Sequence, residues 1–472
     1  MKFNKPTEEI IKQLGGAVNG RVYTGDAIKQ DYAHDEMAIY GERMPDAVVE
    51  VISTQEVSSV CKICYENDIP VIPRGAGTGL CGGCVALYGG IVLDTSKMNK
   101  ILSCDMENFT VRVQAGVLLD DLANDCASKG VMYPPDPGEK FATVGGNVAS
   151  NAGGMRAVKY GTTRDYVRAM TVVLPDGEIV RFGGEVSKTS SGYSMMHLMI
   201  GSEGTLGIIT ELSLKLIPQP KQSVSLLAMF ANLGICISCV SKIKMAGLEP
   251  QALEFMTREN VVSIEAFLGK TVYPGKVDGD DVGAYLLVTL DCGTEDEMNA
   301  LMENAAEIFT ENGALDVVVY DTPEGMRNAW AVRAACLESI LANYKQMDEC
   351  DVVVPIPQIA NFVNYVTSLE SEIGLAIRAT GHAGDGNVHV NVCANGMDAD
   401  DFMQRAERFM ELAYGKASEL GGLISGEHGI GSGKVKFLET ALGKTNMRLM
   451  RGVKAVFDPK GLLNPGKVCN RI

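Results

Sequence analysis

The 472-residue sequence lacks features that would place it in several common protein classes. Acidic residues outnumber basic ones by 59 to 42, which gives a formal net charge of −17. This balance argues against nucleic-acid binding, because the neutralisation of phosphates requires clusters of basic side chains. It also disfavours adsorption to anionic lipid surfaces, which attract basic segments.

The sequence also shows no signal peptide and no membrane span. Met1–Gln13 mixes lysine and glutamate without the apolar core of a secretory signal. The longest apolar run, Val224–Val240, is interrupted by Ser, Asn and Gly. A strand over Ser223–Phe230 followed by a helix over Asn232–Ala246 explains this run better than a span does. We therefore expect a soluble, cytoplasmic protein.

Cysteine is abundant, with 13 residues, but the four-cysteine run of an iron–sulfur protein is missing. Ser53-Thr54-Gln55-Glu56 is a capping-box pattern that opens a helix, and one stripe of that helix carries two of the cysteines. We interpret the paired cysteines as small buried hydrophobes in a reducing compartment. Three pairs have C-x-x-C spacing: Cys61/Cys64, Cys81/Cys84 and Cys236/Cys239.

The length and the 52 glycines indicate more than one domain with several tight loops. The first half alternates strands and helices and ends near Pro218 and Pro220, whereas longer helices and separate strands follow, as in an α+β domain. A hairpin is expected around Pro175-Asp176-Gly177. The expected strands are Ala47–Ile52, Gly90–Asp94, Phe109–Gln114, Ala284–Leu290 and Leu375–Ala379. The expected helices are Thr54–Asn67, Leu118–Lys129, Arg327–Leu341, Asp400–Leu420 and one within Asn446–Ile472.

Three glycine-rich loops in the first half could surround a pyrophosphate with backbone N–H groups: Arg74–Gly79, Thr143–Gly154 and Gly201–Gly207. They do not form a dinucleotide-binding fingerprint of the Rossmann type, because Leu80 stands where the third glycine is required. A Walker lysine is missing too. Three such loops in one domain indicate a large, extended ligand with two negative charges.

Histidine is scarce, and its distribution is informative. Of five histidines, three lie in the glycine-rich segments Gly381–His389 and Glu427-His428. Val388–Val392 alternates like a strand that places His389 and Asn391 on one face. Two histidines and a carboxylate can hold a divalent ion with open coordination positions, and this donor set suits Zn²⁺, Mn²⁺, Fe²⁺ or Co²⁺.

Taken together, the motifs resemble those of the FAD-linked D-2-hydroxyacid dehydrogenases of the vanillyl-alcohol-oxidase-like superfamily. This resemblance implies an α+β fold: a two-subdomain FAD-binding domain over 1–220, an α+β substrate domain with an antiparallel sheet over 221–425, and a C-terminal segment, 426–472, that returns to the first domain. The motifs that carry it are Pro73–Leu80, Pro135–Pro137, Thr143–Asn147, Asn151–Gly154, Tyr160-Gly161, Gly201–Ile209 and Asn464–Lys467.

The resemblance also implies a set of FAD-binding residues. Some relatives attach the flavin through a histidine of the first loop. That loop carries Thr78 and no histidine here, so we expect non-covalent FAD. The implied cofactor-binding residues are Arg74, Gly75, Ala76, Gly77, Thr78, Gly79, Leu80, Pro137, Thr143, Gly145, Gly146, Asn147, Ser150, Asn151, Gly153, Gly154, Tyr160, Gly161, Glu203, Gly204, Gly207, Ile208, Ile209 and Asn464.

For the chemistry, the resemblance implies that His382, His389 and Glu427 bind the metal and that His428 is the general base. A 2-hydroxy acid would chelate the ion, lose its hydroxyl proton to the base and pass its Cα hydride to flavin N5. Arg333 would bind the substrate carboxylate, with Asn391 as a further contact. The hydroxyglutarate enzymes carry a threonine and a lysine where this chain has Leu337 and Glu349, which favours a monocarboxylate such as D-lactate.

Several alternatives remain open at this point. The catalytic subunit of a glycolate oxidase has the same motifs, a flavin-binding subunit without substrate chemistry would explain the loops alone, and a metallohydrolase would explain the histidines alone. We expect a protein to accept the electrons, because neither a nicotinamide site nor a membrane-inserting segment is visible. Related dehydrogenases use electron-transferring flavoprotein subunits; iron–sulfur subunits and quinone are the other candidates.

Overall fold

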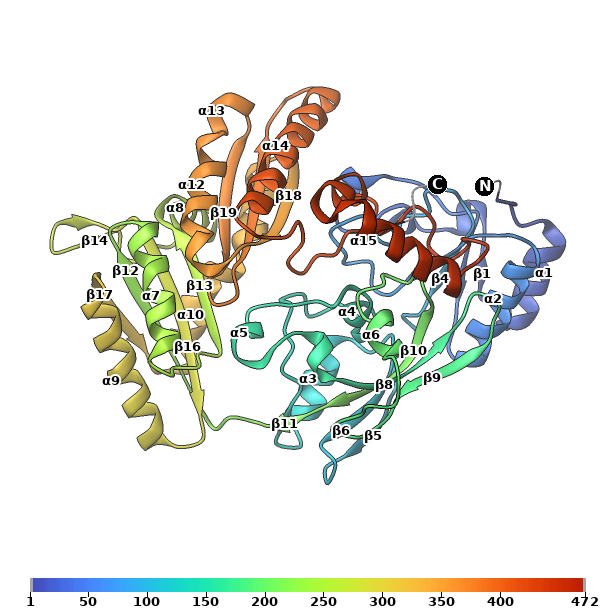
Figure 1. Cartoon of the computed structure of the whole chain (residues 1–472), viewed down its shortest axis with the longest axis horizontal. Coiled ribbons are helices and arrows are strands. Elements are labelled where there is room, and N and C mark those ends of the chain that lie inside the picture. The colour runs from blue at the N-terminus through green and yellow to red at the C-terminus, as the bar shows by residue number, and fades with distance from the viewer. Residues whose placement is uncertain (1–2, 470–472) are drawn as a thin grey trace. The chain divides into compact units, whose positions relative to one another are not determined.

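The computed structural model describes residues 3–469, which divide into two units. Unit 1 comprises residues 1–153, 162–219 and 427–472, and unit 2 comprises residues 154–161 and 220–426. These boundaries lie within two residues of those expected from the sequence, except that the short segment 154–161 packs with unit 2. Figure 1 shows the elements of both units.

Unit 1 contains a four-stranded sheet in the order β1-β2-β4-β3 and a five-stranded antiparallel sheet in the order β5-β6-β10-β8-β9. Strands β2, β4 and β3 are parallel, and β7 pairs with β11 separately. The strands are β1 (Val22–Tyr23), β2 (Ala47–Glu50), β3 (Val71–Arg74), β4 (Ile91–Asp94), β5 (Ile101–Asp105), β6 (Thr110–Gln114), β7 (Val131–Met132), β8 (Val167–Val173), β9 (Ile179–Gly183), β10 (Ile208–Lys215) and β11 (Ile217–Pro218). The helices are α1 (Glu8–Ala17), α2 (Thr54–Glu66), α3 (Leu119–Ala127), α4 (Val144–Ser150), α6 (Met195–Met199) and α15 (Val435–Phe457).

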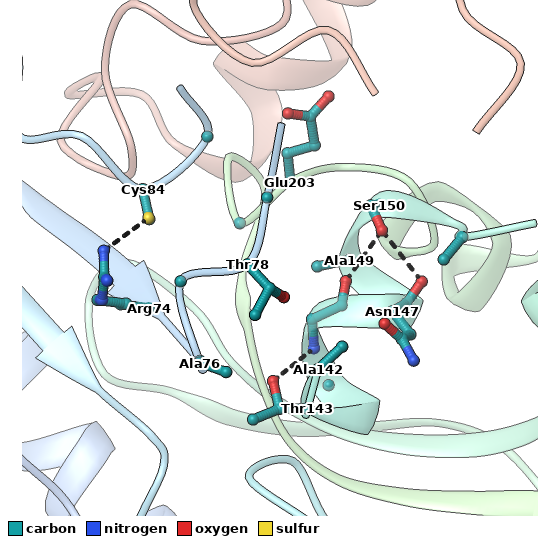
Figure 2. A pocket seen from close by; sticks show the side chains of 18 of the residues that line it. Arg74, Ala76, Thr78, Cys84, Ala142, Thr143, Asn147, Ala149, Ser150 and Glu203 are labelled. Atoms are coloured by element: carbon teal, nitrogen blue, oxygen red, sulfur yellow. Dashed lines mark hydrogen bonds between the residues drawn. The ribbon is translucent and has the colours of Figure 1, made fainter. Parts of the chain in front are cut away.

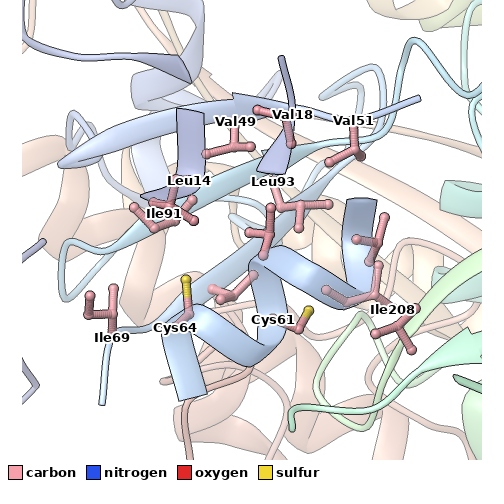
Figure 3. Close-up of a cluster of buried hydrophobic side chains, with 14 of the residues drawn as sticks. Leu14, Val18, Val49, Val51, Cys61, Cys64, Ile69, Ile91, Leu93 and Ile208 are labelled. Atoms are coloured by element: carbon pink, nitrogen blue, oxygen red, sulfur yellow. The ribbon is translucent and has the colours of Figure 1, made fainter. Parts of the chain in front are cut away.

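The core of unit 1 packs α1 and α2 against the parallel strands (Figure 3). Helix α2 starts at the N-cap Ser53, whose hydroxyl accepts the Glu56 N–H, as the capping pattern predicts. Cys61 and Cys64 on α2 are buried in this core, and burial raises the pKa of the Cys64 thiol to about 12. Their interpretation as small buried hydrophobes is confirmed, and it also holds for Cys236 and Cys239.

The C-terminal segment belongs to unit 1 because it continues the parallel sheet. Val71 donates its N–H to Leu462, and Asn464 donates its N–H to Val71. Helix α15 begins at Val435, eleven residues before the helix expected from the sequence, and Gly443 interrupts it with non-helical backbone angles. The sequence prediction therefore found this helix but placed its start too late.

Unit 2 is built on a seven-stranded antiparallel sheet in the order β17-β12-β16-β13-β19-β20-β18. The strands of this unit are β12 (Gln222–Phe230), β13 (Ala252–Thr257), β14 (Lys276–Val277), β15 (Asp280–Asp281), β16 (Ala284–Cys292), β17 (Ala314–Tyr320), β18 (Gln346–Val353), β19 (Ala376–His382) and β20 (Asn387–Ala394). The helices are α5 (Ala157–Tyr160), α7 (Leu233–Met245), α8 (Arg258–Leu268), α9 (Glu295–Glu311), α10 (Pro323–Ala334), α11 (Cys336–Asn343), α12 (Ile359–Ser368), α13 (Glu370–Ile373) and α14 (Ala399–Glu419).

Two helical layers cover this sheet. Helices α8 and α10 pack their apolar residues on one face of β12, β16 and β13. Helices α9, α7, α12 and α14 contact one another in that order and form the other layer (Figure 1). The helix expected over Arg327–Leu341 is in fact two helices, because the backbone leaves the helical path at Ala335 between α10 and α11.

Candidate functional site

Unit 1 contains a pocket of about 260 Å³ between the three glycine-rich loops (Figure 2). Glycines of these loops stand where a side chain would collide with a neighbouring segment. A Cβ atom on residue 145 would lie 2.6 Å from the Cβ of Ala115. Gly77 has a φ of +80°, which L side chains rarely adopt, and a Cβ there would collide with the guanidinium of Arg74. These glycines therefore let the loops around the pocket approach their neighbours closely.

The pocket gathers most of the residues predicted to bind the cofactor. Asn151 ends α4 in the left-handed conformation outside the pocket, while the Asn464 side chain donates to the Gly83 and Glu203 carbonyls and so braces two of the loops. Gly154, Tyr160 and Gly161 belong to unit 2, where the Tyr160 hydroxyl donates to Asp291. The predicted residues that line the pocket are Arg74, Gly75, Ala76, Gly77, Thr78, Gly79, Leu80, Pro137, Thr143, Gly145, Gly146, Asn147, Ser150, Gly153, Glu203, Gly204, Gly207, Ile208 and Ile209.

The polar groups of this pocket fit a large dinucleotide. The amide nitrogen Nδ2 of Asn147 is buried and has no hydrogen-bond partner within residues 3–469. A buried donor of this kind costs free energy unless a ligand accepts from it. Arg74 places a positive charge in the wall, where its Nη1 lies 3.0 Å from the Cys84 sulfur. The cavity thus offers a side-chain donor and a cation to an anionic ligand.

Glu427 and His428 also line this pocket, and their loop is held by two partners. The Glu203 carboxylate accepts the N–H groups of Ile430 and Gly431, both at 2.8 Å. The carbonyl of Cys81 accepts two further N–H groups from residues 432 and 433. Burial raises the pKa of Glu203, although the two N–H groups oppose this shift. Glu203 therefore fixes the loop of the predicted base, a role that its predicted cofactor contact did not include.

Two further buried charges lie near the pocket. Asp35 lines it and accepts the N–H groups of Met37 and Gly83, yet burial raises the pKa of this carboxyl to about 6. Burial also lowers the pKa of Lys467 to about 8, and its ammonium donates to the Val85 carbonyl at 2.6 Å. Lys467 belongs to the motif Asn464–Lys467, but its burial could not be predicted, and Asp35 was not singled out, because nothing in the local pattern shows that it is buried.

In unit 2, the register of the sheet brings polar side chains to one face of its central strands. His382 on β19 pairs with Glu254 on β13, and His389 on β20 pairs with Asp351 on β18. Residues that pair directly point to the same face of a sheet. This face is also the one covered by α8 and α10, because Met256 on β13 belongs to their apolar cluster.

The two histidines of this face approach each other through their Nε2 atoms, which lie 3.4 Å apart. Both side chains are buried, and the Nδ1 of His382 lies 2.7 Å from a Glu254 carboxylate oxygen. Two nitrogens at this separation, each about 2.1 Å from an ion, would subtend an angle of about 110° at it. The pair therefore fits two ligands of a single divalent ion.

Asp351 connects the strand of His389 to the segment that leads to Glu427. Its carboxylate accepts the Asn387 side-chain N–H at 2.7 Å, the Ser425 hydroxyl at 2.9 Å and the Gly426 N–H at 3.0 Å. The side chain is fully buried. Because Glu427 follows Gly426 directly in the chain, Asp351 fixes the last residue before the third predicted ligand.

Arg333 and Asn391 lie on this same side of the sheet of unit 2. The Nε of Arg333 donates to Glu254 at 2.8 Å, and the arginine side chain is only 12% exposed. Asn391 borders a cavity of about 20 Å³, and its Oδ1 is buried without a hydrogen-bond partner among the residues that the structure describes. Such an acceptor can take a bond from a ligand or a water molecule.

Sequence reasoning did not identify Glu254 or Asp351. Glu254 is a single acidic residue in the otherwise apolar stretch Leu253–Met256, whereas Asp351 follows Asp348 and Glu349 on the buried part of β18. An acidic residue in a buried strand is rare unless it is paired, so this pattern was the available signal.

Comparisons with known proteins match both units. Residues 219–468 match the model of FAD linked oxidases, C-terminal domain, and residues 45–183 match that of an FAD binding domain. The chain belongs to the FAD-linked oxidase family.

As a member of the FAD-linked oxidases, the chain is a flavin-dependent oxidoreductase. It is 56% identical over 471 residues to a D-lactate dehydrogenase of Anaerostipes hadrus, and the aligned region covers 100% of this chain and 99% of the relative. It is 39% identical to the glycolate oxidase subunit GlcD of Bacillus subtilis, over 99% of this chain and 97% of the relative. A D-lactate dehydrogenase of Archaeoglobus fulgidus is 38% identical, over 90% of this chain and 91% of the relative.

Solved structures confirm the predicted fold class. p-Cresol methylhydroxylase superposes with a TM-score of 0.78 at 17% identity, over 97% of this chain and 96% of that one. 4-Ethylphenol oxidase from Gulosibacter chungangensis has the same TM-score and identity, over 99% of both chains. The FAD-linked oxidase therefore has the fold of the vanillyl-alcohol-oxidase type. Within residues 3–469, no helix combines the length and the apolarity that a membrane crossing requires.

Proposed function

We propose that this FAD-linked oxidase is a metal-dependent dehydrogenase that oxidises D-lactate to the 2-oxo acid. The observation that carries the proposal is the buried pair of imidazole Nε2 atoms, 3.4 Å apart, in unit 2. The names of the two D-lactate dehydrogenases among the relatives support the substrate. Retention of the histidines argues against a flavin subunit without substrate chemistry.

We assign His382, His389 and Glu427 as the ligands of a divalent ion: Zn²⁺, Mn²⁺, Fe²⁺ or Co²⁺. The hydrogen bond from His382 Nδ1 to Glu254 supports this assignment, because it leaves the Nε2 lone pair for the ion. When bound, the ion would lower the pKa of a coordinated hydroxyl, and FAD would accept the hydride.

The remaining steps belong to side chains of the protein. His428 takes the substrate hydroxyl proton on its imidazole, and a base with a pKa near the working pH does this efficiently. Arg333 binds the substrate carboxylate through its guanidinium, a fork that matches the two carboxylate oxygens. Asn391 supplies a further polar contact beside it. The residues cited for the pocket of unit 1 hold FAD without a covalent bond.

The charge of the site supports a monocarboxylate substrate. Glu349 on β18 is buried, and its Oε1 lies 3.8 Å from the Nδ1 of His389. A second carboxylate on the substrate would meet this negative group in a site of low polarity, and like charges there are strongly repulsive. D-2-hydroxyglutarate should therefore be a poor substrate. Glycolate lacks only the methyl group of lactate and is the second candidate, supported by the similarity to the glycolate oxidase subunit.

We further propose that electrons leave the flavin for electron-transferring flavoprotein subunits in the cytoplasm. The acidic surface implied by the net charge of −17 argues against a partner that is itself strongly acidic. Iron–sulfur subunits and quinone are the alternative acceptors, and turnover of the purified chain with each of them distinguishes the three.

The test is an anaerobic titration of the flavin absorbance near 450 nm. D-lactate should bleach the wild-type protein rapidly, and L-lactate and D-2-hydroxyglutarate should not. The variant His428→Ala should keep its flavin and bleach about 10²–10⁴ times more slowly, the usual contribution of a general base. His197→Ala changes an exposed histidine of unit 1 and is the matched control. Wild-type bleaching rates in His428→Ala would refute the assigned base, and bleaching by glycolate alone would refute D-lactate.

A further inference from the structure

Glu254 is a fully buried carboxylate in the middle of the seven-stranded sheet of unit 2. Its neighbours along β13, Leu253 and Phe255, are buried and apolar. Placing a carboxylate in such surroundings costs several kcal/mol of free energy unless it is paired and hydrogen-bonded. Its two partners therefore explain why an acidic residue stands here.

The two oxygens of Glu254 have different partners. Oε1 lies 2.7 Å from the Nδ1 of His382, which is its direct neighbour across β13 and β19. Oε2 accepts the Nε–H of Arg333 at 2.8 Å, and this arginine comes from α10 above the same face. One carboxylate thus joins the strand of a histidine to the helix of an arginine.

These two contacts constrain both partners. An acceptor at Nδ1 places the proton of a neutral His382 on that atom, so the lone pair is on Nε2, the atom that faces His389. The bond to Nε of Arg333 orients the plane of the guanidinium about its stem.

We propose that Glu254 is a positioning residue that links metal binding to substrate binding. It sets the tautomer of His382 for the ion and the orientation of Arg333 for the substrate carboxylate, so each function depends on the other. This inference rests on the proposed function. In this proposal Glu254 acts through its contacts with His382 and Arg333.

The variant Glu254→Gln tests the link, because an amide offers one acceptor oxygen to two donors. Either His382 or Arg333 then faces an N–H group instead of an acceptor. We expect the apparent metal affinity, measured by competition with a chromophoric chelator, to fall about 10- to 100-fold, as for other residues that hold metal ligands. The KM for D-lactate should rise at least about tenfold, and the flavin content should not change.

The matched control is Glu265→Gln. Glu265 is also a buried glutamate of unit 2, it also contacts an arginine, Arg258, and it accepts the N–H groups of Val272 and Tyr273, but it touches neither histidine. We expect this variant to lower the thermal midpoint of the protein while its metal affinity and KM stay at wild-type values. Equal losses in both variants would show that Glu254 acts only through stability.

The variant Arg333→Met provides an independent measurement of metal affinity, which is useful if Glu254→Gln does not fold. Without the arginine, Glu254 interacts with His382 alone and a positive charge near the ion is removed, so the metal should bind at least about threefold more tightly. Unchanged metal affinity in Arg333→Met would overturn the link. A wild-type protein that binds no divalent ion would overturn both this inference and the proposed function. Wild-type affinity in folded Glu254→Gln, with an active parent, would overturn the inference alone.

Discussion

The candidate sites of the two units are formed by different kinds of residues. The pocket of unit 1 is lined by many glycines, several of which stand where a Cβ atom would collide with a neighbouring segment. The site of unit 2 is built from side chains on neighbouring strands, and the sheet register brings them together. A cofactor that is bound through its length and its phosphates needs backbone donors and room. A reacting centre needs a few groups at defined distances.

The two sites also differ in how their charges are satisfied. In unit 2 the buried carboxylates Glu254 and Asp351 have side-chain or backbone partners within 3.0 Å. In unit 1 Asp35 and Lys467 are buried with pKa values shifted toward their neutral forms. Asp35 and Lys467 also have hydrogen-bond partners, at 2.6–3.2 Å, so what distinguishes them is that burial favours the neutral form of each group.

The first prediction has the largest expected effect and separates the two sites. His382→Ala removes an imidazole of unit 2, so substrate oxidation should fall about 10²–10⁴-fold or more, while the flavin remains bound in unit 1. The flavin absorbance of the purified variant and its rate of anaerobic bleaching by D-lactate measure both effects. Loss of flavin from this variant would contradict the separation of roles between the units.

The second prediction tests the backbone pocket. Gly145→Ala introduces a Cβ 2.6 Å from the Cβ of Ala115 and 2.8 Å from its carbonyl oxygen. Overpacking of this size typically costs about 1–3 kcal/mol, so FAD affinity should fall about 10- to 100-fold. Flavin release measured by ultrafiltration checks it. Gly16→Ala, at an exposed position of α1 with no heavy atom near its new Cβ, should leave FAD affinity unchanged.

The third prediction concerns the dependence of stability on pH. The pKa of Asp35 rises from its ordinary value of 3.8 to about 6 in the folded protein. The protonated carboxyl therefore contributes its full stabilisation to the fold below about pH 4, and this stabilisation is lost as the pH rises through 6. Asparagine does not ionise, so the variant Asp35→Asn should not lose stability in this way. Its free energy of unfolding, relative to wild type, should therefore increase by up to about 3 kcal/mol between pH 4 and pH 7.

Denaturant unfolding of both proteins at several pH values measures this difference. Asp26→Asn, at an exposed position of the same unit, is the control and should show no such trend. A pH-independent difference between Asp35→Asn and wild type would mean that Asp35 does not titrate in this range.

Much of the fold could be predicted from local patterns. The strand expected over Ala284–Leu290 and the helix expected over Asp400–Leu420 lie within two residues of β16 and α14. Alternation also placed His389 and Asn391 on one face of β20 correctly. These predictions succeeded because periodicity is a property of neighbouring residues.

Other features could not be predicted because they depend on distant contacts. The break at Ala335 between α10 and α11 has no glycine or proline to announce it. Tyr160 lies in a segment whose surroundings favour FAD, yet its hydroxyl bonds to Asp291, 131 residues away. The roles of the site residues in metal binding and in base catalysis stay predictions, which the experiments above test.

The sequence by itself determined the chemical groups that are available: loops too rich in glycine to be filled, three histidines in two short segments, and an acidic chain. Only the tertiary structure decided which of these groups meet. Glu254 is 128 residues from His382 in the chain, and the pairing of β13 with β19 alone makes them neighbours. The physical reason is that strand register, unlike helical or strand periodicity, is set by the packing of the whole sheet.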